Sequence, residues 1–222
     1  MGIFKNLFGK APAAKQQLID VPNCIKSDSP RVSLTVMTIA DSHGRINKDD
    51  LKSKWNDRID AVFMLGDNFP DDIEAALEII PQGVAIYAVS GNHDSKDLLS
   101  HYERLNELNG QRTELKGCSI TGLSGSIRYK QDDYYSLITN EESERILSDT
   151  PYSDILITHD KPCFNKPETV MAHSGLTGIG EYIKVRRPEI VLHGHLHEPY
   201  IKKYQNTVIR CCYGVEVFEI AF

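Results

Sequence analysis

Short apolar runs, rich in β-branched residues, end directly before polar residues or glycine along most of this sequence, and this pattern limits the folds open to it. From residue 32 onward, VSLTVMTIA precedes DSHG, DAVFML precedes GDN, and VAIYAVS precedes GNHD; DILIT and EIVLH then end before HD and GHLH. Runs of this length and composition predict buried strands. Helical patterns separate the early runs, at residues 71–80 and 96–108. Strands that alternate with helices predict an α/β fold.

Two of the predicted helices start with capping residues. Asp71, directly after Pro70, can serve as the N-cap of the first of them. Thr139 and Glu142 have the spacing of a capping box before a helix predicted at residues 140–148. Both starts are typical of helices that begin directly after a turn.

The second half of the chain has a different order of elements. Residues 118–127 and 207–220 predict strands with no helix inside either segment, and the last segment turns at Tyr213–Gly214. A further helix is predicted for residues 176–187. This order favours either one mixed sheet or two sheets packed face to face.

The length and the first 30 residues define the domain organisation. A chain of 222 residues has the size of one compact domain, which we place at residues 31–222. In residues 1–30, an APAAKQQ segment follows a small apolar face made by Ile3, Phe4, Leu7 and Phe8. We expect a loosely held N-terminal extension, and the alternative is a helix that docks on a partner or a membrane surface.

Charge, hydropathy and cysteine content exclude several classes of function. The formal net charge of -6 gives no general field that attracts long duplex nucleic acid or an anionic membrane, so a small substrate fits better. No apolar run approaches the roughly 20 residues of a membrane-spanning helix. The cysteines show no CxxC spacing, which predicts neither a disulfide framework nor a thiolate zinc site, and a reducing cytoplasm is the expected compartment. They are Cys24, Cys118, Cys163, Cys211 and Cys212.

Each of the five predicted strand ends carries polar residues whose carboxylate, imidazole or amide groups can bind a metal ion. In chain order they are Asp41, His43, Asp67, Asn92, His93, His159, His195 and His197. Loops at the carboxyl ends of strands are where an open α/β sheet binds its ligands, so these residues can meet in space. Such donors suit Mn, Fe, Zn or Co rather than calcium. The set is larger than one such ion uses, and a carboxylate can bridge, so it indicates a two-ion site.

The ordered motifs D-x-H, G-D-N, G-N-H-D, a lone H and G-H-x-H resemble those of the calcineurin-like metallophosphoesterase superfamily, and they span residues 41–197. The resemblance implies an α/β sandwich of two mixed β-sheets flanked by α-helices, in four layers. It also implies two divalent or mixed-valence metal ions. The implied ligands are Asp41, His43 and His197 for one ion, Asn92, His159 and His195 for the other, and Asp67 as the bridge between them.

The same resemblance implies the chemistry. A hydroxide that bridges the two ions would attack phosphorus in line. His93 would sit above the ions and protonate the leaving oxygen, and Asp94 would hold its imidazole in position. Gly194 would let the chain turn sharply after its strand, so that the two histidines which follow reach adjacent ions. His193, on the strand itself, is expected to be a packed residue rather than a ligand.

Two loops are the candidates for substrate binding. His173 lies in the proline-bearing segment after His159, where related enzymes often shape the pocket. The sequence leaves open whether its side chain lines the site or lies outside it. Arg128, in GSIRYKQDDYY, could hold a phosphate or an acidic substituent, and the alternative is a solvated hairpin tip.

Departures from known branches of the superfamily narrow the function. The GDNFPDD segment lacks the arginine of serine/threonine protein phosphatases, and Phe69–Pro70 offers no tyrosine of the kind that purple acid phosphatases use to bind iron. What remains resembles the small, uncapped bacterial or phage-type phosphoesterases. We therefore expect hydrolysis of a phosphodiester or a small phosphorylated metabolite. The alternatives are a nuclease that acts on short or single-stranded ends and a protein-binding scaffold of the same fold without turnover.

Overall fold

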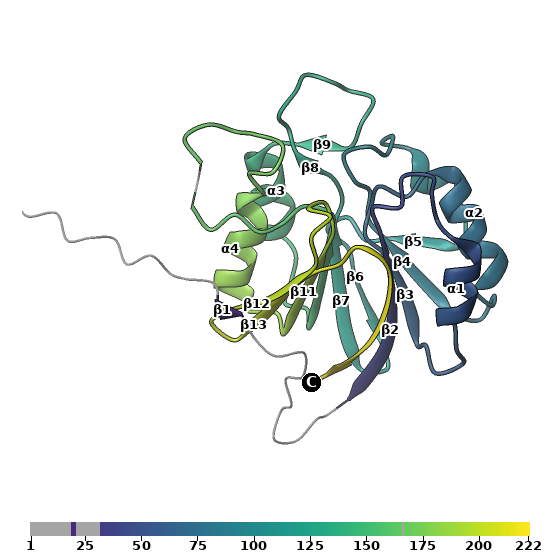
Figure 1. Cartoon of the computed structure of the whole chain (residues 1–222). Coiled ribbons are helices and arrows are strands. Elements are labelled where there is room, and N and C mark those ends of the chain that lie inside the picture. Colours follow the sequence, from purple (N-terminus) through teal and green to yellow (C-terminus); the bar gives the residue numbers. More distant parts are fainter. Residues whose placement is uncertain (1–18, 21–31, 166) are drawn as a thin grey trace, which may run out of the picture.

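The computed structural model describes residues 19–20, 32–165 and 167–222, and most of its strands form two mixed sheets (Figure 1). The larger sheet has the strand order β1 (Ile19–Asp20), β12 (Tyr200–Tyr204), β13 (Thr207–Cys211), β11 (Ile190–His193), β10 (Ile155–Thr158), β7 (Cys118–Leu123) and β6 (Arg112–Leu115). The smaller sheet has the order β14 (Gly214–Ala221), β2 (Ser33–Ala40), β3 (Ala61–Met64), β4 (Ala85–Ala88) and β5 (Leu105–Glu107). A separate short pair consists of β8 (Ser126–Ile127) and β9 (Leu137–Ile138).

Helices cover the outer faces of both sheets. Figure 1 shows α1 (Lys48–Lys54) and α2 (Pro70–Ile79) on one side, and α3 (Asn140–Ser148) and α4 (Thr177–Arg186) on the other. A 3₁₀ turn, η1, spans Leu98–His101. The predicted α/β sandwich of four layers, helices on sheet on sheet on helices, is confirmed.

Alternation along the central strands builds three apolar layers. On β2, Val36 packs into the core between the two sheets, whereas its neighbour Met37 packs against α1 and α2. On β10, Ile157 points into the same central core and Leu156 packs under α3 and α4. Successive side chains of a strand point to opposite faces, so a strand covered on both faces is a continuous apolar run. This explains the uninterrupted runs in the sequence.

The predicted turn at Tyr213–Gly214 lies between β13 and β14. β13 belongs to the larger sheet and pairs with β11, whereas β14 belongs to the smaller sheet and pairs with β2. The two strands therefore do not form a hairpin, and the turn carries the chain from one sheet to the other. Gly214 has a φ of 67°, a left-handed conformation that glycine adopts without steric cost.

The helix predicted for residues 96–108 is wrong. Only η1 forms there, and Leu105–Glu107 forms β5, which pairs in parallel with β4 through Ile86 and Leu105. The apolar spacing suited a helix, but the free edge of β4 offers backbone hydrogen bonds that a strand can use. Tertiary pairing of this kind overrides local propensity.

The two predicted helix starts have different outcomes. The capping box of Thr139 and Glu142 is confirmed at the start of α3. In α2 the N-cap residue is Phe69, with Pro70 in the first turn, and the capping side chain is Asp72 rather than Asp71. The buried Asp72 carboxylate accepts a hydrogen bond from the Phe69 backbone N–H at 2.9 Å.

The N-terminal extension falls mostly outside the described residues. Within it, Ile19–Asp20 forms β1, which pairs antiparallel with Lys202–Lys203 of β12. The expectations for residues 1–18 and 21–30, among them the small apolar face, lie outside the described residues. No helix of the described part is long and apolar enough to cross a membrane.

Candidate metal centre

The ends of strands from both sheets meet at one edge of the sandwich. The His43 N–H donates to the Asp67 carbonyl at 3.0 Å, which joins the loops after β2 and β3. Across the sheets, the His195 N–H donates to both carboxylate oxygens of Asp41, at 3.1 and 2.9 Å. The structure thus brings together residues that lie more than 150 positions apart.

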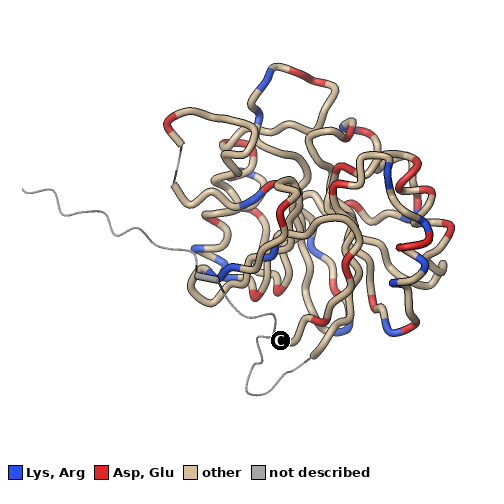
Figure 2. The backbone as a smooth tube through the Cα atoms, viewed as in Figure 1, with Lys and Arg blue, Asp and Glu red and all other residues tan. Residues whose placement is uncertain are grey.

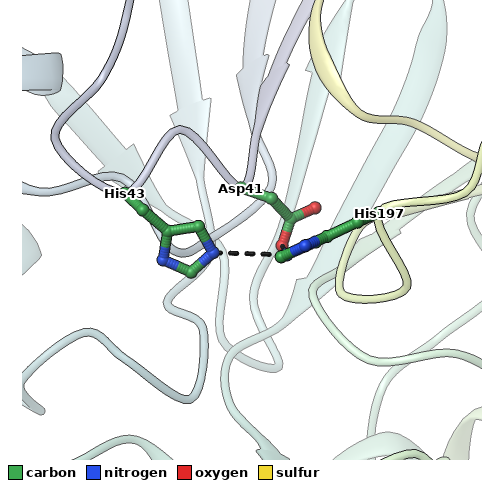
Figure 3. Close-up of side chains that lie close together, drawn as sticks. All are labelled: Asp41, His43 and His197. Atoms are coloured by element: carbon green, nitrogen blue, oxygen red, sulfur yellow. Dashed lines mark hydrogen bonds and ion pairs between the residues drawn. The ribbon is translucent and has the colours of Figure 1, made fainter.

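Three of the candidate ligands form a first cluster, Asp41, His43 and His197. The Nε2 atoms of the two histidines lie 3.2 Å apart, and His197 Nε2 lies 3.5 Å from Asp41 Oδ1. Figure 3 shows the two imidazoles pointing toward each other, with the carboxylate beside them. The donor atoms all lie within 4.8 Å of one another, close enough for one ion to contact all three. Burial lowers the pKa of His43, which favours the neutral imidazole that a metal requires.

Asp67 lies between the candidate ligands His43 and His159. Its Oδ2 atom is 3.7 Å from His43 Nε2 and 3.5 Å from His159 Nε2. Asp41, Asp67 and His159 form a second cluster of donors within 4.8 Å. Burial, and to a smaller extent the neighbouring Asp67 carboxylate, raises the pKa of Asp41. Two buried carboxylates beside each other favour a bound cation.

His159 supplies the clearest sign that a cation belongs here. The ring is fully buried, and its Nδ1 atom lies 2.8 Å from the Leu65 carbonyl oxygen, which requires an N–H at Nδ1. In the neutral ring the Nε2 lone pair then faces the Asn92 side-chain oxygen at 3.0 Å and the Asp67 carboxylate. Burial opposes a proton on this ring, but Asp67 and Asp41 outweigh it and raise the pKa of His159. The lone pairs of His159 Nε2, the Asn92 oxygen and the Asp67 carboxylate face one another, and they repel unless a proton or a metal ion lies between them. The residues present therefore fit a metal ion.

His195 lies beside the second cluster but is not one of its donors. Its Nε2 atom lies 2.8 Å from the Ala172 carbonyl oxygen, and its ring centroid is 4.9 Å from that of His159. Burial, then the neighbouring His159, lowers the pKa of His195 to about 4, so the ring is neutral at pH 7. A neutral ring that donates from Nε2 keeps its lone pair on Nδ1, which is the atom left for an ion.

Three glycines are needed at the site because a Cβ atom would collide with a candidate ligand, and on Gly66 it would lie 2.5 Å from His159 Nδ1. A Cβ on Gly91 would lie 2.2 Å from Asp67 Oδ1, and one on Gly194 would lie 2.7 Å from Asp41 Oδ2. The expected sharp turn at Gly194 takes another form, because the left-handed residues are His195 and His197 themselves, with φ of 71° and 54°. Gly194 is required for close approach to a carboxylate rather than for its backbone angle.

His93 lies beside the clusters but is not part of them. It is exposed, and its ring centroid is 5.2 Å from that of His43. Its backbone N–H donates to Asp67 Oδ1 at 2.8 Å, which ties its position to the centre of the ligand set. The ring is therefore free to contact a substrate.

Asp94 differs from the expectation that it holds the His93 imidazole. It is buried, and its Oδ2 atom accepts hydrogen bonds from the backbone N–H groups of Gly91 at 2.7 Å and Asp67 at 2.8 Å. Its Oδ1 atom is buried and has no hydrogen-bond partner among the described residues, so neither carboxylate oxygen is bonded to the His93 ring. Burial, then the neighbouring Asp67, raises the pKa of Asp94 to about 7. Its side chain fixes the loop that carries Asp67.

The remaining candidates separate into near and distant ones. The His173 ring lies 4.9 Å from the His195 ring, which brings its loop to the site. The Arg128 guanidinium donates to the Leu137 carbonyl at 2.7 Å and lies 3.5 Å from Asp133. It is therefore held within the segment from β8 to β9, whose two strands pair in parallel rather than as the hairpin considered above. His193 is buried with its Nε2 atom 2.8 Å from the Tyr200 hydroxyl, the packed position expected for it.

Two buried aspartates support the loops, and sequence reasoning missed both. Besides capping α2, Asp72 accepts hydrogen bonds from the N–H groups of Gly44 at 2.6 Å and Ile46 at 2.9 Å, next to His43. Asp160 accepts bonds from Ile127 N–H at 2.9 Å and Ser126 Oγ at 3.0 Å, next to His159. Both follow a recognised motif, but only their burial, which one sequence does not display, distinguishes them from surface acids.

Comparison with known proteins supplies a family and a fold. Residues 34–211 match the family model described as the calcineurin-like phosphoesterase superfamily domain. A search of the curated proteins found no match. Among solved structures, a Thermus thermophilus protein, TT1561, is similar, with a TM-score of 0.60 and 15% identity; the match covers 86% of this chain and 99% of that one.

Two enzymes of known type are also similar in structure. The phosphopantetheinyl hydrolase of Mycobacterium tuberculosis has a TM-score of 0.54 and 12% identity, over 82% of this chain and 90% of that one. A dimetal phosphatase of Danio rerio has a TM-score of 0.50 and 14% identity, over 84% of this chain and 88% of that one. At these identities the likeness shows the fold.

Proposed function

This chain belongs to the calcineurin-like phosphoesterase superfamily, and we propose that it hydrolyses a phosphoester with two divalent or mixed-valence metal ions, Mn, Fe, Zn or Co, held at the strand-end clusters. The observation that supports this most is the buried His159 ring, whose Nε2 atom faces the Asn92 oxygen at 3.0 Å and the Asp67 carboxylate at 3.5 Å. Hydrolase activity on phosphoesters is the activity of the family, whereas the number and kind of ions and the substrate are our proposal.

Each proposed ion has its own ligands and one shared carboxylate. When bound, the ions would supply Lewis acidity, which makes hydroxide available near neutral pH and offsets the charge of the phosphoryl oxygens. The central position of Asp67 between His43 and His159 supports its role as the bridge. The proposed ligands are Asp41, His43 and His197 for one ion, and Asn92, His159 and His195 for the other.

His93 is the residue that we assign to the leaving group. Its ring is exposed beside His43, and neither cluster of donors includes it. The hydrogen bond from its backbone to Asp67 keeps the ring at a fixed place relative to the ligands. From there it can donate a proton to the leaving oxygen or stabilise the charge that develops on it.

We propose a phosphodiester or a small phosphorylated metabolite as the substrate. The net charge of -6 gives no long-range attraction for a polyanion. His173, which lies against His195, supports a pocket wall formed by the loop that follows β10. Because the Arg128 guanidinium is bound to the Leu137 carbonyl, we do not assign it to the substrate.

The first experiment compares bis-p-nitrophenyl phosphate with p-nitrophenyl phosphate on the full chain, stripped of metal and refilled with manganese. We expect turnover of the diester in the refilled protein and none above background in the stripped protein, because the ions supply the activated water. A preference for the monoester would indicate a phosphorylated metabolite instead. No hydrolysis of either ester despite bound manganese would contradict the proposal and favour a protein-binding scaffold.

Removing the support of the His43 loop should weaken metal binding. In the Asp72→Asn variant, one oxygen that accepts from the loop becomes an amide nitrogen, so the loop beside His43 loses a fixed partner. We expect manganese to bind about 10-fold more weakly in calorimetric titrations, the usual cost of losing an outer partner of a ligand. Asp71→Asn, on the exposed face next to it, is the matched control and should bind manganese like the unmodified chain. Equal affinities for the two variants would show that Asp72 serves the fold alone.

A further inference from the structure

A loop of nine residues joins β8 to β9 and projects at the top of the molecule (Figure 1). We call residues 128–136 the β8–β9 loop. At its end, the Ser136 N–H donates to the Asp94 carbonyl at 3.0 Å, and the Lys96 N–H donates to the Tyr134 carbonyl at 3.1 Å. These backbone bonds attach the loop to the residues next to His93, so its side chains keep a defined position at the site.

Tyr135 brings an aromatic ring to the His93 side of the site. Its ring centroid lies 6.4 Å from that of His93, with the planes inclined by 71°, and the ring is half-buried. Tyr134 packs edge-on against it at 5.0 Å and is itself 67% exposed. The two rings form an apolar wall beside the histidine that we assign to the leaving group.

Lys130 places a cation against the same wall. Its Nζ atom lies 4.3 Å from the Tyr135 ring centroid and 3.5 Å from Asp132 Oδ2, and its side chain is 37% exposed. Figure 2 shows the basic and acidic stretches of this loop at the top of the molecule. An exposed ion pair of this kind contributes little, so an incoming anion can replace Asp132 as the partner of the ammonium group.

The distances fit a substrate that reaches from His93 to Lys130. The Tyr135 ring centroid lies 6.4 Å from the His93 ring centroid and 4.3 Å from Lys130 Nζ. The distance from Lys130 Nζ to the His93 ring centroid therefore cannot exceed the sum of these two distances. A small alcohol that leaves beside His93 can span this distance with a second charged group. The Arg128 guanidinium, by contrast, is already bonded to the Leu137 carbonyl and to Asp133.

We propose that Tyr135 and Lys130 form a subsite for the leaving part of the substrate, where the ring contacts this part and the ammonium group binds a second anionic group on it. The substrate class is a phosphoester of a small alcohol that carries its own carboxylate or phosphate. This inference rests on the proposed function, because it takes the alcohol to leave on the His93 side.

The test compares phenyl phosphate with 3-carboxyphenyl phosphate, which differ by one carboxylate on the leaving group, by phosphate release from the manganese-refilled full chain. We expect a higher kcat/KM for the charged ester. In Lys130→Met the ratio of the two kcat/KM values should fall by about 10-fold, mainly through KM of the charged ester, because one charge-assisted contact is lost. Differences in intrinsic reactivity between the esters cancel when ratios are compared between variants.

Three further variants separate the subsite from general effects. Lys130→Arg keeps the cation, so the ratio of the two kcat/KM values should stay close to that of the unmodified chain. Tyr135→Phe keeps the ring under the ammonium group, so the same ratio is expected for it. The control is Lys202→Met. Lys202 also lies over a tyrosine ring, with its Nζ atom 4.7 Å from the Tyr200 centroid, but it is on β12. Its loss should leave the ratio of the two kcat/KM values unchanged.

The outcomes distinguish the subsite from the activity itself. An unchanged ratio in Lys130→Met, on a chain that hydrolyses phenyl phosphate, would overturn the subsite and leave the proposed function standing. An equal fall in Lys202→Met would show a general charge effect and would also overturn it. No hydrolysis of either ester or of the p-nitrophenyl esters would contradict the proposed function and the subsite together.

Discussion

Replacing His93 with alanine is expected to lower kcat by about 10²- to 10⁴-fold while both metal ions stay bound, because His93 acts on the leaving oxygen rather than on a metal. The structure supports this separation: the ring is exposed, and the clusters of donors are formed by other residues. The variant keeps its backbone, so the bond from residue 93 to Asp67 Oδ1 can persist and the ligands keep their places. Steady-state kinetics on bis-p-nitrophenyl phosphate and the metal content of the same sample measure the two effects side by side.

The matched control for this variant is His101→Ala. His101 is an exposed histidine on η1 that pairs with Asp97, so its loss should leave kcat within about twofold of the unmodified chain. If the variant at residue 93 lost an ion, His93 would be a ligand and its assignment would be wrong. If it kept both ions and full kcat, another group would have to protonate the leaving oxygen.

Replacing Asp67 with alanine is expected to abolish the two-ion site. Its carboxylate lies within 4 Å of His43 Nε2 and His159 Nε2, so one substitution removes a donor from both groups of ligands. Losing a residue that only hydrogen-bonds a metal ligand lowers metal affinity by up to roughly 100-fold. Because Asp67 is proposed as a ligand itself, its loss should lower the affinity for at least one ion by more than that. Calorimetric titration of the stripped protein with manganese measures this, and turnover of the diester should fall to the level of the stripped chain.

A second variant at this position separates charge from geometry. Asp67 also accepts the backbone N–H of His93, and alanine removes that bond together with the bridge. Asp67→Asn keeps an oxygen that can accept the same bond, so it should hold His93 in place and still fail to bind two ions, because the amide lacks the negative charge. Two ions bound to either variant at full affinity would place the bridge on another residue, with Asp41 as the nearest carboxylate in the second cluster.

The strands that carry the site could be predicted from the sequence, because burial on both faces leaves a continuous apolar run. β2, β3 and β10 match the runs at residues 32–40, 60–65 and 154–158 to within a residue or two at each end. The prediction failed where a distant partner decides the structure, because residues 105–107 have helical spacing but pair with β4. The sequence also left open which sheet each of the last two strands joins, and they join different ones.

Individual contacts at the site could not be predicted in the same way. Asp94 was expected to contact His93, its neighbour in sequence, yet its carboxylate binds the N–H groups of Gly91 and Asp67. Asp71 was expected to cap α2, yet the next residue does so and also binds the loop beside His43. In both places the direction in which a carboxylate points decides its partners, and a single sequence does not give that direction.

By itself, the sequence determined the layered α/β fold and the ordered donors at strand ends, because the period of apolar residues and the residue types after each strand are local properties. Tertiary structure alone decided which donors meet. His195 reaches Asp41 only because the two sheets pack face to face, and Tyr135 reaches His93 only because the β8–β9 loop is bonded to the segment after Asp94. Such contacts join residues far apart in the chain, and their geometry depends on packing that no local pattern encodes.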